Sequence, residues 1–207
     1  MSTTKIEGTA RERLLAAANE LFYAEGVHTV GIDRVIERAG VAKASLYSTF
    51  GSKDELVRAY LAARHELRRK RLAERIARHD NPRDRILAIF DLQGELFREP
   101  TFRGCAFVNA SAEGPRGGQI QGVCDDSRAF VRGLFTDLAR ELGVADPENL
   151  GRRLVLLYDG ATVAASMDRN PRAAAEARAM AAALLDEARS AAAPRARAGK
   201  RRAATRD

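Results

Sequence analysis

The stretch GIDRVIERAGVAKASLYSTFGSK, residues 31–53, restricts the fold more than any other part of the sequence. Its first half carries apolar residues at the spacing of one helical face, namely Ile32, Val35, Ile36 and Ala39. Gly40 follows them and can adopt the positive φ that ends a helix. A second short helix is expected over residues 43–50. Two short helices joined at a glycine predict a helix-turn-helix.

The second of these helices has two different faces. Leu46 and Phe50 lie four residues apart and are expected to pack inward. The other side chains are small, hydroxyl-bearing or singly charged, and such a face can enter the major groove of DNA and bind phosphates or base edges. An ordinary surface helix of an all-helical protein is the alternative, because short helix pairs joined at glycine are common.

Residues 39–56, AGVAKASLYSTFGSKDEL, resemble the DNA-binding signature of the TetR-type transcriptional regulators. The resemblance is specific to about residue 60 and looser beyond it. It departs at Val30 and Gly31, where many members carry Thr and Ser, so Val30 is left out of the expected binding set. That set combines the groove-facing residues with the family pattern and consists of Arg34, Ala42, Lys43, Ala44, Ser45, Tyr47, Ser48, Thr49 and Lys53.

The composition of the 207-residue chain favours a helical protein. Only 6% of the residues are aromatic, 30% are charged and none is Trp. No segment approaches the ~20 apolar residues that a membrane span needs, and the N-terminus lacks the apolar core of a signal peptide. We therefore expect a cytoplasmic protein.

The net charge of +7 is weak support for DNA binding, because the distribution of charge matters more than its sum. Residues 1–60 hold 8 Lys and Arg against 8 Asp and Glu, so the expected DNA-binding head is neutral. The positive excess lies in residues 61–80 and in the tail after Pro194. The DNA-binding hypothesis therefore depends on the groove-facing residues.

Cys105 and Cys124 are too few for a disulfide framework or a zinc site, and the three histidines form no metal spacing with them. Buried, reduced thiols are expected, with a redox-sensing pair as the alternative. The sequence also has no HExxH motif, no glycine-rich phosphate cradle and no evident nucleophile beside a base. It therefore predicts no metal, no cofactor and no enzyme activity.

Capping patterns predict most of the helix starts. Thr9 with Glu12, and Ser52 with Glu55, form capping boxes. An Asn or Asp precedes a proline at three further expected starts, which are Pro82, Pro147 and Pro171. A short helix is expected over residues 102–112, a long one follows from Gln119, and the last helix should end near Ala193.

The expected architecture is all-α, with about nine helices, because no alternating strand pattern occurs. Residues 1–52 are expected to form a three-helix, helix-turn-helix DNA-binding head. Residues 53–193 are expected to form a helical effector-binding and dimerisation domain. Low hydrophobicity and like charge predict that residues 194–207 form a basic, disordered tail.

The middle helices contain most of the aromatic residues of the chain, and core packing accounts for most of them. A few polar residues lie among them, which is typical of a small-molecule pocket. The resemblance implies that an effector binds in this region, and the residues expected to bind it are Phe90, Phe107, Asn109, Phe130 and Tyr158.

The last two expected helices are rich in Ala and are apolar on more than one face. A four-helix contact between two copies would cover that surface, whereas packing inside one monomer is the alternative. The resemblance also implies that this helix pair is the dimer interface.

Together these features predict a homodimeric repressor that a small-molecule effector releases from a palindromic DNA operator. The alternative is a helical ligand-binding protein or enzyme that keeps the fold without sequence-specific DNA binding.

Overall fold

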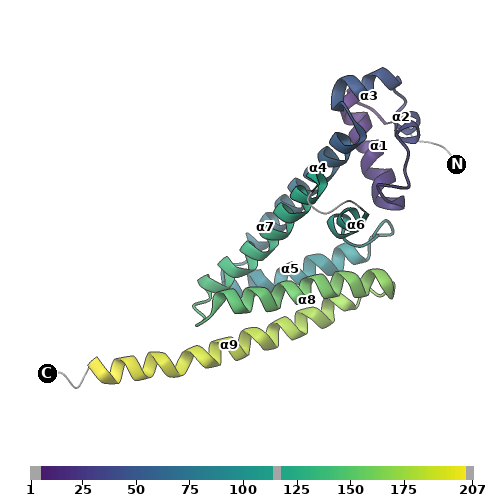
Figure 1. Cartoon of the computed structure of the whole chain (residues 1–207). Coiled ribbons are helices and arrows are strands. Elements are labelled where there is room, and N and C mark those ends of the chain that lie inside the picture. The colour runs from purple at the N-terminus through teal and green to yellow at the C-terminus, as the bar shows by residue number, and fades with distance from the viewer. Residues whose placement is uncertain (1–5, 114–117, 204–207) are drawn as a thin grey trace. The chain divides into compact units, whose positions relative to one another are not determined.

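The structure is a computed structural model that describes residues 6–113 and 118–203 (Figure 1). Over these residues it contains nine α-helices and no strand, which confirms the expected all-α fold. The helices are α1 (Ala10–Glu25), α2 (Ile32–Ala39), α3 (Lys43–Phe50), α4 (Lys53–Ile76), α5 (Pro82–Phe97), α6 (Ala106–Glu113), α7 (Gln119–Glu141), α8 (Pro147–Met167) and α9 (Ala173–Ala203). None of these helices combines the length and the hydropathy that a membrane span requires.

Side-chain caps begin three helices where the sequence predicts them. At α1 the Thr9 hydroxyl accepts from the Glu12 N–H at 3.3 Å, and the Glu12 carboxylate accepts from the Thr9 N–H at 2.8 Å. This is a complete capping box, which satisfies N–H groups that lack a partner inside the helix. Asn81 and Asp146 cap α5 and α8, each just before a proline at the first helical position.

The start of α4 carries only half of the expected capping box. Ser52 Oγ accepts from the Glu55 N–H at 3.2 Å, as the box requires. The Glu55 carboxylate, however, accepts from the Arg58 guanidinium at 2.8 Å, one turn further along the helix. An ion pair within α4 therefore takes the place of the second half of the box.

The start of α9 differs from the sequence prediction. The Asn170 side chain accepts from the Arg172 N–H at 3.0 Å and closes a turn. Regular helix begins only at Ala173, so the predicted start at Pro171 is wrong.

Two other helix boundaries are also corrected. α6 begins at Ala106 rather than near Phe102, because Gly104 adopts a φ of 82° that interrupts helical backbone. The sequence predicts that the last helix ends near Ala193, whereas α9 continues through Pro194 to Ala203. A proline removes one helical hydrogen bond, while the Ala and Arg residues around it are strong helix formers. Residues 204–207 of the predicted tail lie outside the described residues, and for them disorder stays a prediction.

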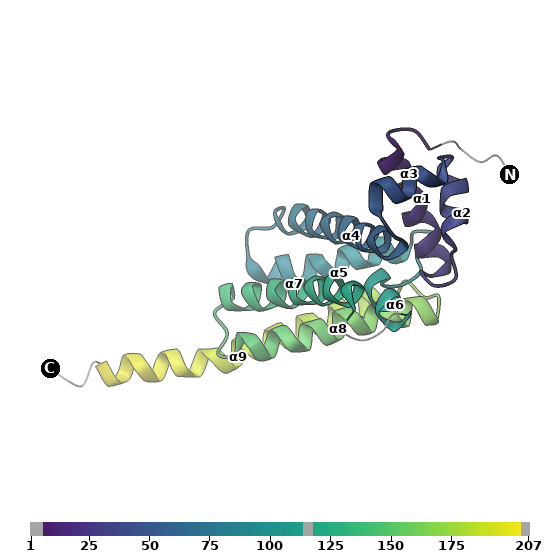
Figure 2. The same ribbon diagram turned by 45° about the horizontal axis from the view of Figure 1, so that its top comes forward.

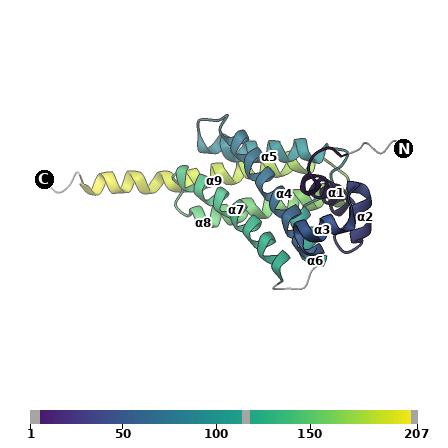
Figure 3. The same ribbon diagram turned by 90° about the horizontal axis from the view of Figure 1, so that it is seen from above.

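The chain packs as two compact units. The first comprises the chain up to Arg69 together with Cys105–Ser127, and the second comprises Lys70–Gly104 and the chain from Arg128. This division differs from the predicted functional boundary between residues 52 and 53, because the core of the first unit also includes side chains of α6 and α7. In the first unit α1 packs against both α2 and α3 (Figure 3).

The second unit is built around a helix pair. α8 and α9 lie side by side, and α5 packs against both of them (Figures 1 and 2). Its core contains the aromatic rings of Phe90 and Phe135, whose centroids lie 5.8 Å apart, and small alanine side chains of α9. Alanines on α9 allow the neighbouring helices to approach closely.

Candidate nucleic-acid interface

The turn between α2 and α3 has the geometry that the sequence predicts. Gly40 adopts a left-handed conformation, with a φ of 61° and a ψ of 44°, and its N–H donates to the last turn of α2. Leu46 of α3 is fully buried beside Val35 and Ala39 in the core of the first unit. α3 is therefore held by its inner face, and its outer face is left for other contacts.

A side chain of α1 braces this turn. The Arg13 guanidinium donates a hydrogen bond to the Gly40 carbonyl oxygen, which joins α1 directly to the backbone between the two helices. A second guanidinium of α1, that of Arg11, lies over the Phe50 ring at 5.7 Å from its centroid. These contacts add to the packing of Leu46 in joining α3 to α1.

The outer face of α3 is exposed as expected. Tyr47 is 48% exposed, although its neighbour Leu46 is completely buried. Of the other residues in the expected set, Ser45 and Lys53 are half-buried and the rest are exposed, namely Arg34, Ala42, Lys43, Ala44, Ser48 and Thr49. Val30, which the set leaves out, is fully buried.

Two hydroxyls of this face already use their hydrogens within the helix. Ser48 Oγ donates to the Ser45 carbonyl oxygen at 3.2 Å, and Thr49 Oγ1 donates to the same oxygen at 2.6 Å. In this arrangement their free lone pairs can accept hydrogen bonds from the amino groups of cytosine or adenine. To donate to a phosphate, either hydroxyl must first give up its bond to Ser45.

The two strongest candidates for phosphate contacts are paired with acidic side chains. Lys43 Nζ lies 2.8 Å from Asp33 Oδ1, and this hydrogen bond raises the pKa of Lys43. The Arg34 guanidinium donates to both carboxylate oxygens of Glu25, at 2.7 and 2.9 Å, which lowers the pKa of Glu25. The sequence pattern indicates the two cations but not their acidic partners Asp33 and Glu25. For either cation to bind a DNA phosphate, the phosphate would have to compete with these carboxylates.

The residues expected to bind an effector do not share one packing unit. Phe107 and Asn109 belong to the first unit, where Phe107 is buried and Asn109 is exposed. Phe90, Phe130 and Tyr158 belong to the second, in which Phe90 and Tyr158 both contact the ring of Phe135. The aromatic pattern of the sequence thus includes residues from two cores.

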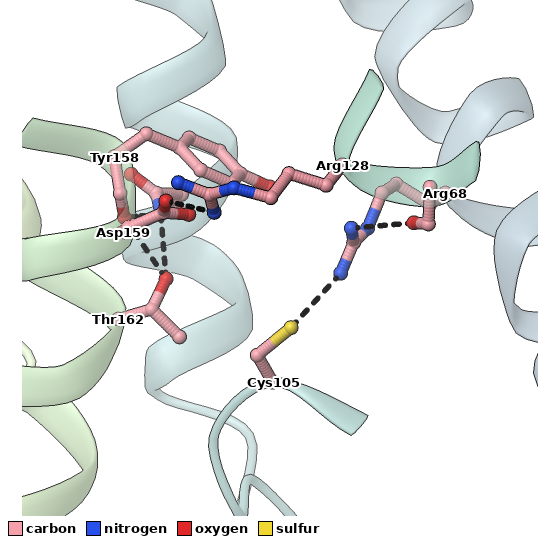
Figure 4. A network of polar contacts seen from close by, with 8 residues as sticks. Arg68, Cys105, Arg128, Tyr158, Asp159 and Thr162 are labelled. Carbon is pink, nitrogen blue, oxygen red and sulfur yellow. Dashed lines mark hydrogen bonds and ion pairs between the residues drawn. The ribbon is translucent and has the colours of Figure 1, made fainter. Parts of the chain in front are cut away.

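Gln93 is a buried polar residue that no sequence pattern indicates. It is 2% exposed, and its amide nitrogen donates to the Tyr158 carbonyl oxygen at 2.9 Å and to Thr162 Oγ1 at 3.0 Å (Figure 4). Its Oε1 is buried and has no hydrogen-bond partner among the described residues. The Tyr158 carbonyl can only accept, so the nitrogen must face it and Oε1 must point away. Close by, Arg128 forms an ion pair with Asp159 at 2.5 Å.

The two cysteines are free thiols in different surroundings. Cys124 is buried, and burial raises the pKa of its thiol to about 11. Cys105 is half-buried, and its sulfur accepts from the Arg68 guanidinium at 3.5 Å, while the same guanidinium donates to Ser127 Oγ at 3.0 Å (Figure 4). Cys124 is therefore unreactive as a thiolate at neutral pH.

Over the described residues, a helical fold with a braced helix-turn-helix and an exposed outer face on the second helix of that motif is typical of DNA-binding regulators. Comparison with known proteins gives the family. The model for "Bacterial regulatory proteins, tetR family" matches residues 14–60. The HTH-type transcriptional repressor NemR of Escherichia coli K12 is 34% identical, with 79% of this chain and 87% of NemR covered. The chain belongs to the TetR family of bacterial transcriptional regulators.

Solved structures agree with this family. The crystal structure of SCO4454, a TetR-family transcriptional regulator from Streptomyces coelicolor, is 32% identical, with a TM-score of 0.83 over 86% of this chain and 95% of that one. The reduced form of E. coli NemR is 26% identical, with a TM-score of 0.75 over 83% of this chain and 94% of NemR. The protein is thus a DNA-binding transcriptional regulator and not an enzyme.

Proposed function

We propose that the protein is a homodimeric repressor that binds a palindromic operator through α3 and leaves it when a small-molecule effector binds. The observation that carries this proposal is the contrast between buried Leu46 and exposed Tyr47 on adjacent positions of α3. That contrast leaves small and hydroxyl-bearing side chains on the face that can approach base edges. Repression is proposed because the relative NemR is named a repressor.

The homodimer is proposed from an apolar stripe on α8. Leu156 is 68% exposed and Met167 is 77% exposed, and Val163 between them is also exposed. With Gly160 these positions follow a spacing of four, three and four residues, which is one face of a helix. The opposite face of α8 is buried in the second unit, so this stripe has no role in the monomer's own core.

Met180 on α9 is exposed as well. A contact between two copies of the α8 and α9 pair would cover all of these side chains, as in a four-helix bundle. Two copies would also present two α3 helices to DNA half-sites that lie about one helical turn of DNA apart, ~34 Å. The interface between copies thus accounts both for the exposed apolar residues and for a palindromic operator.

The effector response is proposed from the polar residues among the aromatic rings of the second unit. Gln93 has an acceptor free for a donor group, and Tyr158 and Phe90 lie in the same cluster. Within this unit, Phe90, Phe130 and Tyr158 remain proposed to bind the effector. Phe107 and Asn109 of the first unit belong to the same expected set, and an effector contact by them is a separate proposal. An effector must favour the released state by ~5.5 kcal/mol to change the balance from 1:99 to 99:1.

Selection of bound duplexes from a random pool tests the proposal directly. The selected sequences should be palindromic, and Tyr47→Ala should abolish their selection without lowering Tm. Leu67→Ala is the matched control, because Leu67 is equally exposed, at 48%, but lies on α4. A wild-type protein that selects no sequence would favour the alternative of a helical ligand-binding protein without DNA activity.

A further inference from the structure

We propose that Glu113, at the end of α6, is a positioning residue for the DNA-binding head. Its carboxylate holds the loop between α1 and α2, so that α6 is a second mechanical connection to the helix-turn-helix besides α4. The part of this inference that concerns operator affinity rests on the proposed function.

The contact joins segments that are far apart in the sequence. Glu113 Oε2 accepts from the backbone N–H of His28 at 2.7 Å, across 85 residues of chain. The other carboxylate oxygen lies against Gly26, where a Cβ added to the glycine would be only 2.9 Å from Glu113 Oε1. Gly26 also has a φ of 96°, which side-chain-bearing residues rarely adopt. The loop is thus shaped to receive the carboxylate.

The rest of α6 places this carboxylate. Ala106, Phe107 and Ala110 are buried in the same core as Phe22 and Val27 of the head. Positions 106, 110 and 113 are separated by four and three residues, so they lie on one face of the helix. The apolar face of α6 therefore packs against the head, and Glu113 lies at the C-terminal end of that face.

The stability of α6 does not explain a carboxylate at this position. The C-terminal end of a helix carries a partial negative charge, which makes an acidic side chain in the last turn unfavourable. Glu113 occupies that turn, and its hydrogen bond to His28 offsets the unfavourable position. The favourable interaction is thus with the loop and not with α6.

α6 is also tied to α7 within the first unit. Ser111 Oγ donates to Gln121 Oε1 at 2.9 Å, and Gln121 Nε2 donates to Asp125 Oδ1 at 2.8 Å. Movement of this part of α7 therefore moves α6. Because Val27 and Val30 of the loop are buried in the head, a displaced loop also displaces the start of α2.

Glu113→Ala and Glu113→Gln test the proposal, because the glutamine keeps an acceptor oxygen and loses only the charge. Asp126→Ala is the matched control, since it removes the same charge from an exposed position of α7 in the same unit. The first measurement is the hydrogen exchange rate of the His28 amide by NMR, without DNA. The second is the affinity for the selected operator duplex by fluorescence anisotropy.

Glu113→Ala should speed His28 exchange about tenfold or more, the factor expected for one lost charge-assisted hydrogen bond. It should also weaken operator binding. Glu113→Gln should show smaller changes in the His28 exchange rate and in operator affinity, and Asp126→Ala should change neither quantity. Unchanged His28 exchange overturns the proposal, and so does faster exchange with unaltered operator affinity. A wild-type protein that binds no DNA is recognised before any variant is made, and it overturns the proposed function together with this inference.

Discussion

Replacing Lys43 with Ala should reduce the salt dependence of operator binding without changing the thermal stability of the protein. Lys43 Nζ pairs with Asp33 at 2.8 Å, and both side chains are exposed. Exposed ion pairs contribute little to stability, because solvent screens them and both side chains lose freedom. Tm should therefore stay at the wild-type value, and the effect should be confined to DNA binding.

The magnitude follows from the number of phosphates that the lysine neutralises. Each phosphate contact adds ~0.9 to the slope of log affinity against log salt concentration, so two copies of Lys43 in a dimer add ~1.8. Between 50 and 200 mM salt the wild type should thus lose about 12-fold more affinity than the variant. Fluorescence anisotropy at four or five salt concentrations resolves a change of this size.

Lys70→Ala is the matched control for this measurement. Lys70 is also an exposed lysine that pairs with a carboxylate, Glu74, at 3.9 Å, but it lies on α4 in the second unit. Its removal should leave the slope unchanged. Equal slopes for the wild type and Lys43→Ala would refute a phosphate contact by Lys43. Asp33→Asn should strengthen binding at low salt, because it frees the lysine and removes a negative charge near DNA.

Four further outcomes are expected. Gly40→Ala should lower Tm and operator affinity. A left-handed φ costs a side-chain-bearing residue about 1–2 kcal/mol, and the new Cβ would lie 2.7 Å from Arg13 Nη2. An unchanged melting curve would contradict the expected loss of stability. Gln93→Leu should leave Tm unchanged or raise it. The variant loses two hydrogen bonds of about 1 kcal/mol each, but it also removes a buried, unpartnered acceptor that costs about 1–3 kcal/mol. A large drop in Tm measured by calorimetry would argue against an unpartnered Oε1. Burial raises the pKa of Cys124 from 9.0 to about 11, so the thiol ionises at lower pH in the unfolded chain, and the free energy of unfolding should fall between these pH values. In urea titrations the free energy of unfolding of Cys124→Ala should fall less over this range. The same pH dependence for the wild type and the variant would count against a raised pKa of Cys124. Leu156→Glu should convert the proposed dimer to a monomer in sedimentation experiments, and a variant that is as dimeric as the wild type places the interface elsewhere.

The helix-turn-helix could be predicted from the sequence because the interactions that build it are local. Gly40 ends α2 in a left-handed conformation, and Leu46 is the buried position of α3. Capping, turn and helical-face signals act between residues within about one turn of each other. The same reason explains the correct starts of α1, α5 and α8. The start of α9 was predicted wrongly because Asn170 forms a turn in place of a helix cap.

The acidic partners of the cations in the expected DNA-binding set could not be predicted in the same way. Lys43 and Arg34 each had many possible partners, since the chain contains 28 Asp and Glu residues. The packing of α1, α2 and α3 brings Asp33 and Glu25 within hydrogen-bond distance of them. The division of the effector set between the two units was unpredictable for a related reason, because periodicity identifies apolar residues but does not say which core each one enters.

By itself, the sequence determined the class of fold, the position of the helix-turn-helix and the side of α3 that faces outward. Only the tertiary structure decided that Glu113 meets the backbone of His28 and that Gln93 is buried with one oxygen unpartnered. The physical reason is distance along the chain: local signals depend on neighbours within a turn, whereas these contacts exist only after separate helices have packed together.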